Sequence, residues 1–277
     1  MNTFLTDRFP YDVLSDFGLT REMIEDLPEY VLDTIISGGR SPLLPIVMQT
    51  KYGSVSGRAK FRLVPRGNNE PLGVILYPKL KEAPLASFSD EEKQSLLDGK
   101  VIIADIKAYN LDDEGTHTEK CFVQLDKDTN HIFCINTPVI ARNIMNIDTF
   151  VDITAAQMEL LKKGEIITVD AEPEPMSIGI DLFSDAGIFA YPGEVEQWKR
   201  MVGKAMPKYS FGTEGCWINE NGELRYVKEE DFDATIKQAC EIIAQVNARH
   251  AKSSEQTEES PVMHKEQREE ETSQLSR

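Results

Sequence analysis

Strict alternation of polar and apolar residues marks the first strands of this chain. The segment "VSGRAKFRLVP" (residues 55–65) alternates throughout, and "RGNNEPLGVILYP" (residues 66–78) supplies a turn and a return strand. Because successive side chains of a strand point to opposite faces, Arg58, Lys60 and Arg62 should share one face while Phe61 and Leu63 enter a core. The pattern predicts an antiparallel hairpin packed on the preceding helices.

Short helices with clear end signals precede this hairpin. Gly18 can end a first helix in the left-handed conformation, and Thr20 can cap a second. Pro28 suits the start of a third helix, which Gly38 and Gly39 should close.

Two stretches of the chain repeat one local pattern. "FSDEEKQSLLDGKVIIAD" (residues 88–105) and "ITAAQMELLKKGEIITVD" (residues 153–170) match at a constant offset of 65 residues. Each has a capping box, a helical leucine, a helix-ending glycine and an apolar strand. The matched residues are Ser89 and Thr154, Glu92 and Gln157, Leu96 and Leu161, and Gly99 and Gly164. We predict two copies of one helix–glycine–strand module, which stack because neither buries its own face alone.

Turn signals continue the pattern toward the C-terminus. The first copy should end in a hairpin that turns at residues 127–130, and the second in a tighter one that turns near 184–187. A helix follows Pro192, then a hairpin at Asn221-Gly222, and a final helix over about residues 230–248.

The expected fold class is α+β, made of small helix-plus-antiparallel-hairpin units, two of them repeated, stacked in one elongated or multi-lobed body. The expected parts are N-terminal helices plus hairpin (1–85), a first repeat module (86–150), a second repeat module (151–191), a C-terminal helix–hairpin–helix (192–249) and a disordered acidic tail (250–277).

These features resemble a known group of sequences. The opening "FPYDVLSDFGLTREMI", the segment "SPLLP" and tandem modules of the pattern Q/E-x3-LL-x-G are similar to an uncharacterised domain family of Bacteroidetes mobile-element (conjugative transposon) proteins. The resemblance covers roughly residues 10–190 and rests on caps and glycines. It implies a setting in DNA transfer or maintenance, and it carries over no catalytic residue.

Composition narrows the compartment and the partners. The longest apolar runs fall short of the ~18 residues that span a bilayer, and the N-terminus lacks a secretory signal pattern, so a cytoplasmic protein is expected. Its four scattered cysteines are expected to be reduced thiols, mostly buried. The net charge is -17, which disfavours general binding to phosphate backbones.

One segment runs against this acidic balance. Residues 34–69 contain no acid and six bases, which are Arg40, Lys51, Arg58, Lys60, Arg62 and Arg66. We predict that these cations bind a phosphate group or an acidic partner. The competing interpretations are an ordinary solvated strand face and a face neutralised by the acidic modules nearby.

Two weaker patterns suggest metal chemistry. His117, Cys121, His131 and Cys134 are residue types that zinc accepts, but their spacing fits no standard finger, and we expect no metal. Asp105 and Lys107 form a D-x-K pattern found in metal-dependent nucleases, without the upstream acid that this chemistry needs.

Other catalytic motifs are missing, including phosphate-binding, dinucleotide-binding and nucleophile-elbow patterns. The leading hypothesis is a non-enzymatic interaction or accessory protein, without a cofactor and with another protein as partner, associated with mobile-element DNA handling. The alternatives are direct nucleic-acid binding through the basic strand 58–62, a metal-dependent nuclease, and an acidic mimic of DNA.

Overall fold

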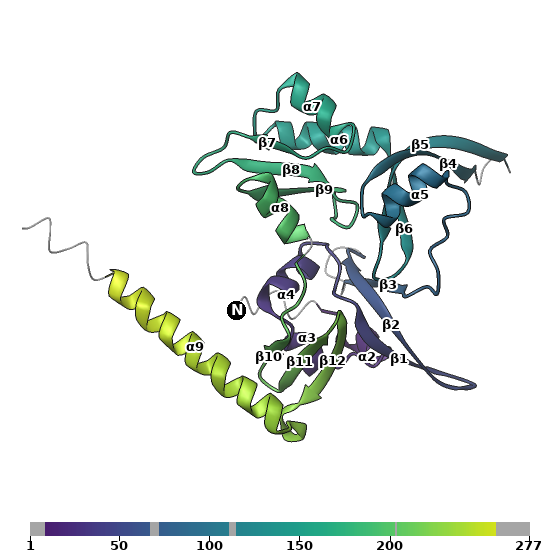
Figure 1. Ribbon diagram of the computed structural model, residues 1–277. Helices are drawn as coiled ribbons and strands as arrows, with labels where there is room; N and C mark the ends of the chain where they lie inside the picture. Colours follow the sequence, from purple (N-terminus) through teal and green to yellow (C-terminus); the bar gives the residue numbers. More distant parts are fainter. Residues whose placement is uncertain (1–8, 67–71, 111–114, 203, 259–277) are drawn as a thin grey trace, which may run out of the picture. The chain divides into compact units, whose positions relative to one another are not determined.

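The computed structural model describes residues 9–66, 72–110, 115–202 and 204–258 (Figure 1). Within them, the chain forms helices and four three-stranded antiparallel sheets, which confirms the α+β class. The chain divides into two compact units, the first ending at Tyr226 and the second beginning at Val227. The expected boundaries after residues 85, 150 and 191 therefore lie between sheets inside the first unit.

The first sheet (sheet A) follows three short helices. The helices are α2 (Tyr11–Ser15), α3 (Arg21–Glu25) and α4 (Glu29–Ile36). The strands are β1 (Leu44–Thr50), β2 (Gly53–Val64) and β3 (Gly73–Pro78), in the order β1-β2-β3. The predicted hairpin is the β2–β3 pair, and β1 adds a third strand. Thr20 caps α3 and Gly18 is left-handed at φ +75°, as predicted.

The two repeat modules form the next two sheets. Sheet B contains β4 (Ile102–Asn110), β5 (Gly115–Asp126) and β6 (His131–Asn136), after α5 (Asp90–Leu97). Sheet C contains β7 (Ile167–Val169), β8 (Met176–Ile180) and β9 (Ile188–Pro192), after α7 (Ala155–Leu161). Sheet D contains β10 (Tyr209–Phe211), β11 (Gly215–Glu220) and β12 (Glu223–Lys228), after α8 (Val195–Val202).

All four sheets are therefore three-stranded meanders that a helix precedes, so the structure repeats one topology four times where the sequence indicated two copies. The two copies recognised in the sequence are the two with capping boxes. Ser89 and Thr154 each accept from the third helical residue, whose side chain reaches back. Gly99 and Gly164 share φ +83°, a conformation that favours glycine.

The hydrophobic cores join the sheets in pairs. One core combines the N-terminal helices and sheet A with Trp217 and Leu224 of sheet D. A second combines Phe122 of β5 with residues of sheet C, including Ile178 and Ile180. The repeat modules thus pack on each other, as their incomplete cores predicted.

Two helices differ from the sequence-based expectation. α6 (Thr137–Asp148) was not predicted; it begins with Pro138 in its first turn and buries Ile140 and Ile144. In the second unit, a short 3-10 turn (Glu229–Asp231) precedes α9 (Ala234–Glu258). α9 continues past residue 250, where a disordered tail was expected, and residues 259–277 lie outside the described part.

Candidate interaction surface

Arg40 is a buried structural cation. Its side chain is 6% exposed, and its guanidinium carbon lies 3.4 Å from the ring centroid of Phe133. Tyr77 and Phe183 also flank it, at 4.9 and 4.8 Å. The guanidinium donates a 3.2 Å hydrogen bond to the carbonyl of Leu182. Arg40 thus connects sheet A to β6 and to the β8–β9 turn.

Burial sets the electrostatics around Arg40. Burial lowers the pKa of Arg40, and the nearby Asp126 opposes that shift. Burial likewise raises the pKa of Asp181, while the backbone N–H of Phe183 and the charge of Arg40 act against it. The buried charges in this region thus offset part of one another's desolvation cost, as expected for groups that stabilise a packed interior.

Lys60 joins the same region through a nearly buried ion pair. Its Nζ lies 3.0 Å from Oδ1 of Asp126 and 2.8 Å from Oδ2 of Asp128. The side chains of Lys60 and Asp126 are 13% and 2% exposed. Asp126 also accepts from the backbone N–H of Asp128 at 3.0 Å. Sheet A is therefore tied to the β5–β6 turn of sheet B.

The other two strand cations also pair within the chain. Arg62 donates to Oδ1 of Asp185 in the β8–β9 turn at 2.6 Å. Arg58 donates to the carboxylate of Glu223 and to the carbonyl of Leu224, each at 3.2 Å. Alternation placed these cations on one face as predicted, and acidic residues of the other sheets partly neutralise that face.

Lys51 and Arg66 lie apart from this network. Both are exposed, and they flank opposite ends of β2, which spans roughly 40 Å at the usual strand rise. The Nζ of Lys51 lies 4.9 Å from the ring centroid of Tyr52. The six predicted residues therefore do not meet at one exposed site, and the structure does not test whether any of them binds a partner.

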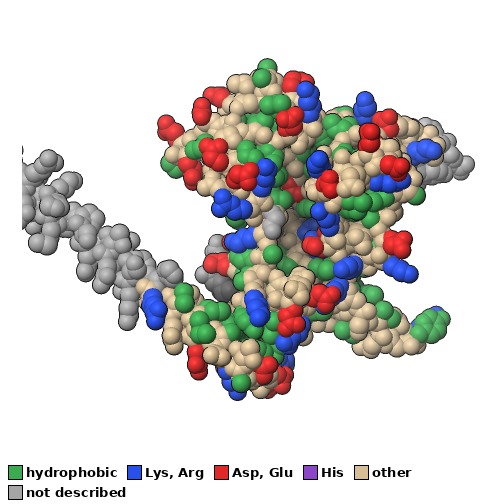
Figure 2. Space-filling model, viewed as in Figure 1, with side chains coloured by type: hydrophobic (Ala, Val, Ile, Leu, Met, Phe, Trp, Pro, Cys, Tyr) green, Lys and Arg blue, Asp and Glu red, His purple; other side chains and the backbone are tan. Residues whose placement is uncertain are grey.

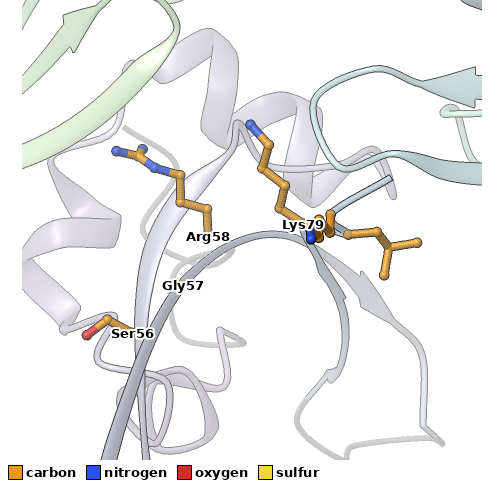
Figure 3. A pocket seen from close by; sticks show the side chains of 6 residues that line it. Ser56, Gly57, Arg58 and Lys79 are labelled. Carbon is orange, nitrogen blue, oxygen red and sulfur yellow. The ribbon is translucent and has the colours of Figure 1, made fainter. Parts of the chain in front are cut away.

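A basic hollow lies where β3 leaves β2, next to the strand cations. It has a volume of about 560 Å³ and is lined by Ser56, Gly57, Arg58, Lys79, Leu80 and Lys81. Arg58 and Lys79 are opposite one another and extend toward the same side (Figure 3). Among the residues that the structure describes, no carboxylate lies within ion-pair distance of Lys79 or Lys81, and both side chains are exposed. The hollow thus has two cations available to an anionic group.

The β1–β2 ribbon adjoins this hollow. We use this name for residues 47–57, where the two strands continue beyond the end of β3 (Figure 1). The ribbon contains no acid, and it exposes Val47, Tyr52 (88%) and Val55. The visible side of this arm has no acidic side chain, whereas acidic and basic groups are mixed over the rest of the same view (Figure 2).

The cysteines and histidines of sheet B do not gather as a zinc site. His117, Cys121 and Cys134 occupy one face, where Glu119 accepts from Asn136 and contacts His117 at 2.7 Å. His131 lies on the other face, with Nε2 2.8 Å from the carbonyl of Pro78. Cys121 and Cys216 are buried as expected, whereas Cys240 is half-buried and Cys134 is exposed. Partial desolvation of the thiol still raises the pKa of Cys134 to about 11, and burial raises the pKa of Cys121. Both shifts oppose thiolate chemistry.

The nuclease pattern of Asp105 and Lys107 also lacks a group of metal-ligating residues around it in the described part. Asp105 and Lys107 lie on β4, where Asp105 is opposite Lys120 and Lys107 is opposite Thr118. In the described residues, no group of three His, Cys, Asp or Glu side chains is placed to hold a metal ion. Asp105 therefore belongs to no such group of three among the described residues.

Comparisons with protein-family models, with curated proteins and with solved structures found no match. None of the described helices is long and apolar enough to cross a bilayer.

Sequence reasoning missed Lys79 and Lys81. They closely follow Pro78, where the return strand ends, and Glu82 comes directly after them in the sequence. The alternation pattern gave no signal for them, because their significance depends on where the chain leaves β2.

Proposed function

We propose that this chain is a non-enzymatic interaction module that binds an acidic partner protein at the basic hollow and the β1–β2 ribbon. The supporting observation is the pair of exposed lysines, Lys79 and Lys81, without a carboxylate partner among the described residues. They adjoin an acid-free ribbon on a chain whose net charge is -17. Local positive charge on an acidic protein favours encounter with a negatively charged surface.

A protein is favoured over nucleic acid for two reasons. The acidic balance of the whole chain repels a phosphate backbone, which would need several cations to offset it. In addition, Val47, Tyr52 and Val55 offer exposed apolar and aromatic contact area, and aromatic residues are enriched in protein interfaces. In our proposal, the module works beside DNA-handling machinery in the cytoplasm, as its resemblance to mobile-element proteins implies.

The test is capture of partners by the full-length chain from a lysate of its host, comparing two charge-reversed variants. Lys79→Glu/Lys81→Glu changes the hollow. The matched control, Lys100→Glu/Lys163→Glu, changes two exposed lysines beside the helix-ending glycines. Both variants lower the net charge equally, so a general charge effect weakens both. We expect the amount of partner recovered to fall at least tenfold further for the hollow variant than for the control variant.

Nuclease treatment separates the alternative. A partner that survives nuclease and depends on Lys79 and Lys81 supports the proposal. If nuclease treatment abolishes recovery of the partner, nucleic acid links it to the chain, and the proposal of a direct protein partner is wrong. Equal recovery by both charge variants would exclude the hollow as the binding surface.

A further inference from the structure

β2 has a free edge beside the basic hollow. β3 pairs with β2 from Ala59 to Val64, and Lys79 then donates to the carbonyl of Arg58 at 2.8 Å. The next residue, Leu80, donates instead to the carbonyl of Thr129, so the chain departs toward the β5–β6 turn. Within the described residues, the β3 side of residues 54–57 therefore has no neighbouring strand.

The direction of the free backbone groups follows from this register. The N–H and C=O groups of one strand residue point to the same edge, and this edge alternates from residue to residue. Because the carbonyl of Arg58 points toward β3, the backbone groups of Ser56 and Ser54 point to the same, open edge. Two N–H donors and two carbonyl acceptors thus face the hollow's side of the ribbon.

The edge lacks the usual protections against pairing. Residues 54–57 are Ser, Val, Ser and Gly, without proline or charge, and their pairing with β1 keeps them extended. Proteins commonly protect such edges with proline, charged side chains or a covering loop. An unprotected edge of this kind is suited to accept a further strand.

The two faces of the ribbon define what that strand must contain. Arg58 and Lys79 are opposite one another and share the face of Ser56. The other face contains Val55, with Met48 opposite it, and then Gly57 opposite Ile46. A complementary strand would therefore place acidic side chains on the first face and apolar side chains on the second.

We propose that the free edge of β2 accepts, by strand addition, an extended segment of a partner protein in which acidic and apolar residues alternate. This inference rests on the proposed function and specifies the partner's chemistry. Backbone hydrogen bonds to Ser54 and Ser56 hold the segment, while the exposed Lys79 and Lys81 select its acidic face. We commit to an acidic partner protein as the occupant, because its carboxylates would complement Lys79 and Lys81, which have no carboxylate partner among the described residues.

The first experiment measures binding of a ten-residue peptide that alternates glutamate and valine, labelled with fluorescein, to the full-length chain. A peptide that alternates lysine and valine is the matched control. We expect saturable binding of the glutamate peptide and at least tenfold weaker binding of the lysine peptide. Amide exchange followed by NMR should show new protection at Ser54 and Ser56, with less change at Val55, whose N–H already faces β1.

The second experiment tests the backbone contacts without changing charge. Ser56→Pro removes an N–H that faces the open edge, so it should weaken binding of the glutamate peptide about tenfold. Ser56→Ala keeps this N–H and should leave the affinity unchanged. Since the proline variant could distort the ribbon, N-methyl groups are also placed in the peptide. N-methylation of every second residue blocks the N–H groups on one edge of the peptide. Methylation on the edge that faces β2 should abolish binding, and methylation on the opposite edge should preserve it.

The outcomes separate the two proposals. If Lys79→Glu/Lys81→Glu abolishes binding but both N-methylated peptides bind equally, strand addition is wrong, and the proposal that the lysines bind an acidic partner is retained. If the glutamate peptide fails to bind while the host partner still depends on the hollow, the alternating segment is wrong and the interaction module stands. If neither peptide nor partner responds to the two lysines, both proposals fail.

Discussion

Removing Lys60 from its buried ion pair with Asp126 is expected to destabilise the first unit strongly. We consider Lys60→Met, which keeps a long apolar side chain and removes the charge. The pair is 3.0 Å long, and the Asp126 side chain is 2% exposed, so the variant leaves a carboxylate buried without its closest cation. Removing one partner of a buried pair typically costs about 3–5 kcal/mol of the free energy of unfolding.

The expected cost is about 3 kcal/mol, at the lower end of that range. Asp126 keeps the backbone N–H of Asp128 at 3.0 Å and the guanidinium of Arg40 at 3.9 Å, and both offset part of the loss. Arg62→Met is the matched control, since it removes the guanidinium that lies 2.6 Å from Asp185, whose side chain is 67% exposed. That pair is accessible to water, so we expect a cost below about 1 kcal/mol.

The assay is urea unfolding followed by the fluorescence of single-tryptophan variants. Trp217 lies in the core of sheets A and D, and Trp198 packs on Phe189 of sheet C, so each reports on a different part of the first unit. Coincident transitions justify a two-state free energy. A double-mutant cycle with Asp126→Asn should give a coupling energy of about 1.5 kcal/mol or more, against less than about 0.5 kcal/mol for Arg62 with Asp185→Asn. Equal costs for the two methionine variants would refute the reasoning from burial.

Two further predictions concern a pair of glycines and a thiol. Gly164→Ala should lower the free energy of unfolding by about 1 kcal/mol, because φ is +83° but the added Cβ meets only ordinary contacts. Gly187→Ala should cost more than about 2 kcal/mol, because its Cβ would lie 2.5 Å from Cδ1 of Ile140; equal costs in urea would contradict this steric account. Since partial desolvation raises the pKa of Cys134 to about 11, its thiolate fraction is small at pH 8 and rises as the pH approaches that value. Iodoacetamide should therefore alkylate Cys134 roughly tenfold to a hundredfold more slowly than glutathione at pH 8, measured by mass spectrometry; a rate equal to that of glutathione would exclude the raised pKa.

Local sequence was sufficient for the elements whose ends have their own chemistry. The capping boxes at Ser89 and Thr154, and the left-handed glycines that follow, depend on sterics and hydrogen bonds within a few residues. The Asn221-Gly222 turn, with φ of +56° and +86°, is equally local. α6 was not predicted, although Pro138 in its first turn is a start signal for a helix.

The fourfold repetition needed the tertiary structure. The units of sheets A and D share their strand order with the repeat modules, but no capping box of the same kind was recognised in their sequences. Topology depends on how strands pair across a sheet, and many sequences can satisfy one pairing pattern.

The fate of the cations also depended on tertiary structure. Alternation alone placed Arg58, Lys60 and Arg62 on one face, since a strand has a period of two residues. Their partners are far away in the chain, with Lys60 66 residues from Asp126 and Arg62 123 residues from Asp185. No local rule identifies such partners, because the pairs form when separate sheets pack and exclude water. The same packing carries the chain away from β2 after Lys79, and thereby leaves the basic hollow and the free strand edge.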